Sequence, residues 1–184
     1  MTRALGIAAV VAMLAGSAFL GRSAASRPSD GGWPLPDFAL RDDQGRVTRL
    51  ADLAGRPWVA AFIYASCGTQ CPMMTAKMKA LRARLPEARL VTFSVDSADT
   101  PERLAAYKKA TGANWMFLTG HNNEVPELCK TGFKLPLAQN VDPKDPILHS
   151  DRLVLVDGKG RVRGFFNPGE EASLLGLVSA LRSL

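Results

Sequence analysis

The hydrophobic positions of this chain form short apolar runs that alternate with longer amphipathic stretches. Continuous apolar runs at 58–64 and 89–95 predict two buried strands, and shorter runs predict strands at 37–40, 46–50 and 115–118. A strand that is apolar on both faces is typical of the centre of a covered sheet. The first two short strands are separated by a polar turn, and together they predict an N-terminal β-hairpin.

Amphipathic or capped stretches predict the helices. One helix is expected from Pro72 to Leu85, where apolar side chains recur at helical spacing and proline suits the first position. A second begins after Thr100, which can cap it, and ends at Gly112. Further helices are expected at 123–133 and 170–181.

The last strands are expected as a hairpin over 152–166, turning at Asp157-Gly158-Lys159-Gly160, after an irregular segment at 135–148. Strands that alternate with helices and finish in a hairpin plus a helix predict an α/β fold. We therefore expect a mixed central sheet flanked by helices.

The N-terminal residues differ from the rest. An apolar run at 4–20 predicts that residues 1–25 are a signal peptide or an N-terminal membrane anchor. Such a run covers roughly 25 Å as a helix, close to the roughly 30 Å of a bilayer core, so both cleavage near Ala25 and retention stay open. Residues 26–36 are interpreted as a linker and 37–184 as a single domain.

Composition narrows the functional classes. The formal net charge is +6, and no basic run interleaved with aromatic residues is present, which argues against nucleic-acid binding. The chain contains three cysteines, an odd number that does not suit a disulfide-stapled exported scaffold. At least one cysteine is therefore expected to have a special use.

The main candidate site is the pair Cys67 and Cys71, which lies where the strand at 58–64 leads into the following helix. A helix N-terminus favours thiolate over thiol, and Gly68 allows the loop to bend. Residues four apart in a turn have Cα atoms roughly 6 Å apart, within the range that a disulfide tolerates. The pair could form a redox couple or bind one metal ion, and chance burial of two core cysteines is the plain alternative.

Histidine is scarce in this chain. His149 precedes the last hairpin, and both it and His121 are ordinarily interpreted as surface residues. Two thiolates with one imidazole would make a soft three-coordinate site, which suits copper better than structural zinc, because closed zinc sites have four ligands. The residues alone leave the metal open.

Several motifs together resemble the Sco/SenC family of copper-delivery proteins. The resemblance covers Pro36 to about Phe166 and rests on the segments "PDFALRDDQGRVTRLADLAGRPWVAAFIY", Cys67-x-x-x-Cys71-Pro72, "FSVDSADTPERLAAY", "LTG" and "HSDRLVLVDGKGRVRGFF". It implies a thioredoxin-like fold. It also implies that Cys67, Cys71 and His149 bind copper and that the protein assists assembly of the copper site of cytochrome c oxidase.

The resemblance further implies a monomer whose partners are the copper-accepting subunit of a terminal oxidase and a thioredoxin-like reductant. The expected location is the periplasmic side of a bacterial inner membrane, with the protein tethered by residues 4–20 or released by cleavage. Gly68 departs from the proline that the family usually has there, and the segment Asp96–Asp99 is one residue shorter than usual.

Two other functions stay open. The pair could act as a thiol-disulfide oxidoreductase on cysteines of a partner apoprotein, although such enzymes normally separate their cysteines by two residues. A peroxidase of related layout is a lesser alternative. Cys129 and Met74 are interpreted as core residues, and Met73 as filler or as a thioether at the mouth of the site.

Overall fold

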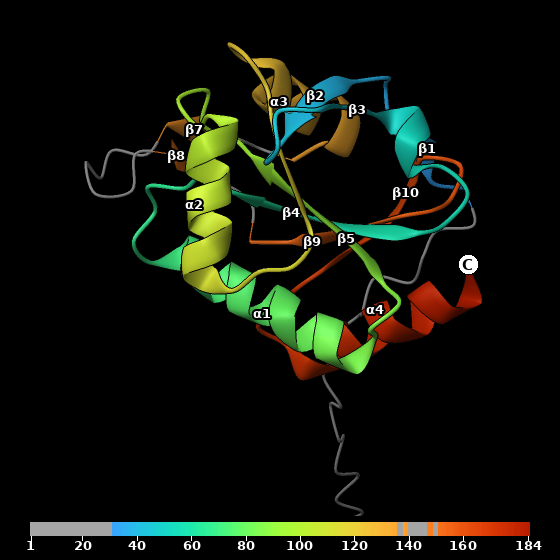
Figure 1. Ribbon diagram of the computed structural model, residues 1–184. Coiled ribbons are helices and arrows are strands. Elements are labelled where there is room, and N and C mark those ends of the chain that lie inside the picture. Colours follow the sequence, from blue (N-terminus) through green and yellow to red (C-terminus); the bar gives the residue numbers. More distant parts are fainter. Residues whose placement is uncertain (1–30, 136–137, 140–146, 149–150) are drawn as a thin grey trace, which may run out of the picture.

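A computed structural model describes residues 31–135, 138–139, 147–148 and 151–184. Among these residues, eight strands form one mixed sheet in the order β1-β10-β9-β4-β5-β6-β2-β3 (Figure 1). The strands of this sheet are β1 (Trp33–Pro34), β2 (Ala39–Asp42), β3 (Val47–Arg49), β4 (Trp58–Ile63), β5 (Arg89–Ser94), β6 (Met116–Thr119), β9 (Leu153–Val156) and β10 (Arg161–Phe166). The expected mixed sheet is confirmed.

Helices cover this sheet, as expected (Figure 1). They are η1 (Leu50–Leu53), α1 (Gln70–Arg84), α2 (Pro101–Thr111), α3 (Glu124–Glu127), the π-helical turn η2 (Leu128–Phe133) and α4 (Glu171–Ser183). The predicted ends of α2 are confirmed. Thr100 Oγ1 accepts a hydrogen bond from the Arg103 N–H, and Gly112 ends the helix in the left-handed conformation with φ of 64°.

The apolar runs at 58–64 and 89–95 form the central strands β4 and β5. All six residues of β4 are buried. Strands β4, β5 and β6 are parallel, whereas β9 is antiparallel to β4. The carboxyl ends of the three parallel strands therefore meet at one edge of the sheet, and β9 begins at that same edge.

An aromatic cluster fills the core beside these strands. The ring of Phe133 packs edge-on against Phe62 at a centroid distance of 4.9 Å, and Phe62 stacks on Phe93 at 5.6 Å. Phe133 ends η2, so the cluster ties the segment after β6 to the central strands.

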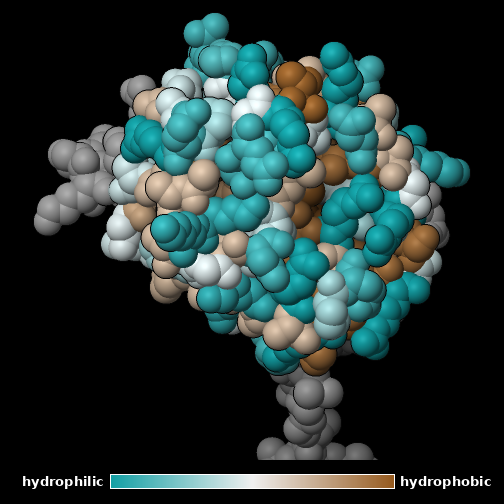
Figure 2. Space-filling view, in the orientation of Figure 1, coloured by the Kyte–Doolittle hydropathy of each residue, from teal (hydrophilic) through white to brown (hydrophobic). Residues whose placement is uncertain are grey.

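Hydrophilic side chains cover most of the face seen in Figure 2, where hydrophobic residues show in a furrow between them.

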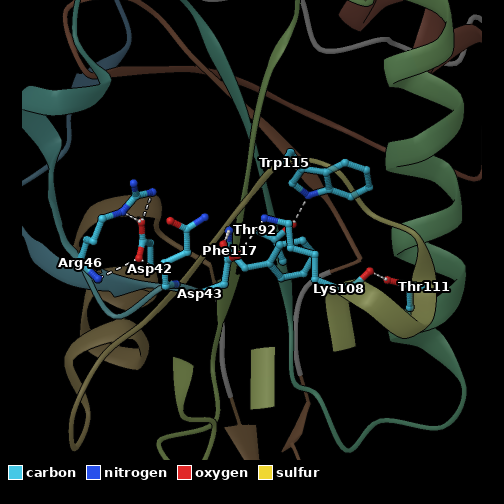
Figure 3. A network of polar contacts seen from close by, with 9 residues as sticks. Asp42, Asp43, Arg46, Thr92, Lys108, Thr111, Trp115 and Phe117 are labelled. Atoms are coloured by element: carbon cyan, nitrogen blue, oxygen red, sulfur yellow. Dashed lines mark hydrogen bonds and ion pairs between the residues drawn. The ribbon is translucent and has the colours of Figure 1, made fainter. Parts of the chain in front are cut away.

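The N-terminal hairpin β2–β3 joins the sheet beside β6. Figure 3 shows how polar contacts fasten it. Asp43, directly after β2, accepts a hydrogen bond from the Phe117 N–H and forms an ion pair with Lys108 of α2 at 2.8 Å. The hairpin extension is thereby joined to both the sheet and a helix.

The folded domain begins before Asp37, where composition placed its start. Trp33 and Pro34 pair with Val162 and Arg161 of β10, and Leu35 is buried. The Trp33 indole N–H also donates to the Gly132 carbonyl at 2.6 Å. Two residues are too few to show strand periodicity, so only the pairing identifies β1.

The segment expected to be irregular contains one short antiparallel pair, β7 (Ala138–Gln139) with β8 (Ile147–Leu148). Across the described ranges, the chain has no helix both long and apolar enough to cross a bilayer. The apolar run at 4–20 lies outside the described residues.

Candidate metal centre

The two cysteines lie in and just after the loop that joins β4 to α1, at the edge where the parallel strands end. The Cys67 N–H donates to the Tyr64 carbonyl at 3.2 Å, which turns the chain immediately after β4. Cys67 is 4% exposed and Cys71 is fully buried, and neither forms a disulfide. The two cysteines thus lie together at the edge where the parallel strands end.

Helix α1 begins at Gln70, two residues earlier than predicted. Cys71 therefore belongs to its first turn, and Pro72 is the third helical residue rather than the first. Proline is tolerated there because the first four N–H groups of a helix have no intrahelical acceptor. The earlier start brings Cys71 into the helix and its backbone N–H toward Cys67.

Each of the two sulfur atoms accepts a backbone N–H hydrogen bond. The Cys71 N–H donates to Cys67 Sγ at 3.4 Å, and the Tyr64 N–H donates to Cys71 Sγ at 3.4 Å. The Thr69 hydroxyl lies 4.0 Å from Cys67 Sγ. Hydrogen bonds to the charged form stabilise it, so this loop is built to hold sulfur as thiolate.

The thiols of Cys67 and Cys129 differ in acidity. Burial, the largest influence, acts to raise the pKa of Cys67, but the hydrogen bonds from Cys71, Thr69 and Tyr64 outweigh it and lower the pKa. Burial without such donors raises the pKa of Cys129. Cys129 is fully buried in the core, which confirms its interpretation. Cys67 therefore has a more acidic thiol than Cys129.

A buried carboxylate that the sequence analysis did not single out holds the cysteine loop. Asp99 Oδ2 accepts hydrogen bonds from the Ala65 N–H at 2.7 Å and from the Ser94 hydroxyl at 2.5 Å. The Asp99 side chain is fully buried, and Arg103 lies 3.6 Å from its other oxygen. Asp99 thus ties the residue two positions before Cys67 to the end of β5.

A second contact joins α2 to α1 beside the dithiol. Thr75, one turn after Cys71, has its hydroxyl 2.9 Å from the Tyr107 hydroxyl. Burial, together with the nearby charge of Cys71 and Cys67, raises the pKa of Tyr107 to about 12. The phenol therefore stays protonated beside the sulfur atoms.

The remaining candidates separate clearly. Met74 is buried, as predicted, whereas Met73 is 63% exposed and is not core filler. His121 is exposed, and its backbone N–H donates to the Glu124 carboxylate. His149 lies outside the described residues. Within the described ranges, no group of three or more His, Cys, Asp or Glu side chains is placed to hold a metal ion.

Gly68 is exposed and does not need to be glycine. Its φ lies outside the left-handed region, and a Cβ built on it meets nothing within 4 Å. We expect Gly68→Ala to stabilise the protein by about 0.4–1 kcal/mol, because alanine reduces the freedom of the unfolded chain. Urea unfolding measures this change in the free energy of unfolding. Gly45→Ala, at a φ of 77°, is the control expected to destabilise, and a loss of stability in Gly68→Ala would contradict the prediction.

The sequence and the fold both match known proteins. A model of the SCO1/SenC family matches residues 31–180. The "SCO1 protein homolog" of Bacillus subtilis (strain 168) is 32% identical over 160 residues, which are 82% of each chain. A protein of Stutzerimonas stutzeri named "Putative copper-binding protein" is 28% identical over 137 residues, 71% of this chain and 67% of that protein.

Two solved structures share the fold. A SCO1/SenC family lipoprotein from Bacillus anthracis str. Ames superposes with a TM-score of 0.75 at 28% identity, covering 83% of this chain and 95% of its own. BsSco, described as a Sco family cytochrome c oxidase assembly protein with a disulfide switch, gives 0.73 at 29% identity, covering 85% and 96%. The expected thioredoxin-like fold is confirmed.

Proposed function

Because the chain belongs to the SCO1/SenC family, we propose that it binds copper through Cys67, Cys71 and His149 and delivers it to the copper site of cytochrome c oxidase. The observation that carries this proposal is the pair of cysteines, not joined in a disulfide, at the junction of the cysteine loop and α1, where each sulfur atom accepts a backbone N–H hydrogen bond. Thiolate is a soft ligand that favours Cu(I), zinc and iron–sulfur clusters over hard cations such as magnesium and calcium. The name of the Stutzerimonas stutzeri relative agrees with a copper cargo.

The third ligand is proposed from chain connectivity. His149 precedes Leu153, the first residue of β9, by four residues, which span at most about 14 Å. Strand β9 runs antiparallel to β4, with Val154 opposite Ala60, so its start lies at the edge from which the cysteine loop leaves. This connectivity is why we propose the imidazole of His149 as the third ligand.

Delivery requires that the dithiol be reduced. A Cys67–Cys71 disulfide holds no thiolate, so a reductant must supply two electrons and two protons, and it becomes a disulfide itself. We propose a thioredoxin-like dithiol protein as this reductant. Copper then passes by ligand exchange to the copper-accepting subunit of a terminal oxidase, with the present protein acting as a monomer.

We also propose that this exchange occurs outside the cytoplasm. Residues 1–25 would act as a signal peptide or as an anchor through 4–20, followed by a linker, so that the domain faces the bacterial periplasm. The Bacillus anthracis relative is described as a lipoprotein, which agrees with a membrane-associated exported protein.

One observation favours a second function, thiol-disulfide exchange with a partner apoprotein. The lowered pKa of Cys67 favours it as the attacking thiolate, and Cys71, whose backbone N–H donates to Cys67 Sγ, would be the thiol that resolves the mixed disulfide. In this role His149 has no part. Rapid disulfide exchange with a reduction potential unchanged in His149→Ala would favour this function over copper delivery.

A copper titration of the reduced full chain tests the first proposal. We expect one equivalent of copper to bind, and His149→Ala to weaken binding by about tenfold or more because a ligand is lost. His121→Ala is the matched control, since His121 is an exposed surface histidine, and it should leave binding unchanged. A failure to bind one equivalent of copper would contradict the proposed ligand set. Equal copper affinities in the two histidine variants would also contradict it.

A further inference from the structure

Basic side chains gather at the end of the domain opposite the cysteines. Two grooves open there, one of about 820 Å³ and one of about 240 Å³. Among the described residues that line them, five are basic and two are acidic: Arg56, Lys159, Arg161, Arg163 and Arg182 against Glu87 and Asp157. We call the surface formed by these two grooves and the residues that line them the basic end.

The larger groove has a rigid frame. Arg161 donates to the carbonyls of Gly31 and Gly32, and Asp157 accepts from the Lys159 and Arg161 N–H groups. Arg163 reaches Asp157 at 3.3 Å, while its Nε makes no hydrogen bond within the described part of the chain. Among the described residues that line this groove, Asp157 is the one acidic side chain beside three basic ones, and it pairs only with that of Arg163. Positive charge is therefore left over for a ligand.

The basic end and the dithiol lie at opposite ends of β4. Gly55, which lines the larger groove, comes just before β4, whereas Cys67 comes just after it. Six strand residues separate the ends by roughly 20 Å. Figure 1 shows the loop between β4 and α1 at the left and the C-terminus at the right. Residues 65–73 around the cysteines carry no charged side chain.

The chain itself indicates what the basic end faces. Gly31, the first described residue, lines the larger groove, and the 30 residues before it contain the apolar run at 4–20. Under the proposed membrane attachment of residues 4–20, on which this inference rests, the chain enters the domain beside this end and holds it nearest the bilayer. Lys and Arg side chains near an anionic bilayer are attracted to its phosphate groups.

We propose that the basic end docks on the headgroups of anionic phospholipids, so that the dithiol points away from the membrane. This surface goes beyond copper delivery and does not depend on which residues bind the metal. It gives the domain one orientation, in which the uncharged cysteine loop is free to meet a partner.

Hydrogen exchange of the full chain on vesicles tests the docking directly. On phosphatidylglycerol vesicles we expect the amides of the turn 158–160 to exchange about tenfold more slowly than on phosphatidylcholine vesicles. The protection should vanish in about 1 M NaCl, where the Debye length is about 3 Å. Equal exchange on both lipids would overturn the proposal, and so would protection that persists in high salt.

Charge reversal identifies the surface. In Lys159→Glu/Arg182→Glu, whose sites are both exposed, the preference for phosphatidylglycerol over phosphatidylcholine should fall by about tenfold or more. Lys77→Glu/Lys130→Glu is the matched control, which changes the net charge equally at exposed sites outside the grooves. It should lower the preference for phosphatidylglycerol by less than about threefold. Equal losses in the two variants would show an effect of net charge only and would refute the assignment. Circular dichroism verifies that each variant is folded.

Discussion

Replacing Cys71 by serine is expected to lower the affinity of the reduced protein for copper by more than about 100-fold, the upper end of what loss of an outer-shell partner costs. A hydroxyl is a harder and far less acidic ligand than a thiol, so it cannot replace the thiolate. Cys67→Ser should have the same effect, because both sulfur atoms receive N–H donors at the same site. Competition with a chelator of known affinity measures the loss.

Cys129→Ser is the matched control for this experiment. Cys129 is fully buried in the core, and burial raises its pKa, so it supplies no thiolate. The variant should bind copper with unchanged affinity, while its unfolding free energy falls by about 1–3 kcal/mol because a hydroxyl is buried in an apolar site. If Cys129→Ser abolished copper binding, or if Cys71→Ser retained it, the dithiol would not be the copper site.

The second large effect is expected at Asp99. In Asp99→Ala the Ala65 N–H and the Ser94 hydroxyl lose their acceptor, and each unsatisfied buried donor costs about 1–3 kcal/mol. We expect the free energy of unfolding to fall by about 3 kcal/mol. The cysteine loop should also loosen, which iodoacetamide labelling of Cys67 detects as a faster reaction.

Asp96→Ala is the matched control, three residues away. The Asp96 carboxylate accepts only a local hydrogen bond from the Ala98 N–H among the contacts described, so its loss should cost less than about 1 kcal/mol. Asp99→Asn keeps an amide oxygen for the Ala65 N–H and should be intermediate. Equal unfolding free energies for Asp99→Ala and Asp96→Ala would show that Asp99 does not hold the loop.

Local pattern predicted the elements that bury continuous apolar runs or carry their own caps. Strands β4 and β5 followed from their apolar runs, and α2 from Thr100, Pro101 and Gly112. These signals are read within a few residues, so no tertiary information is needed. Strand β1 has only two residues, and α1 begins two residues before Pro72. Both boundaries depend on contacts with other segments.

The candidate site, like the fold, was predicted from the sequence only in part. Cys67 and Cys71 were found from the sequence because they are four residues apart and adjoin a strand and a helix. Their supporting residues were not found, since Asp99 and Tyr107 come from the segment after β5 and Thr75 lies in α1 without a motif that points to sulfur. The structure reports their contacts directly. His149 remains a prediction, because it lies outside the described residues.

The sequence by itself determined the cysteine pair, the order of the longer strands and helices, and the family resemblance, because each depends on residue types at short or fixed spacing. Only the tertiary structure decided that backbone N–H groups stabilise the Cys67 thiolate, that Asp99 holds the cysteine loop and that basic side chains gather at the other end of β4. These features depend on hydrogen bonds and proximity between segments far apart in the chain. Such proximity exists only after the sheet has formed.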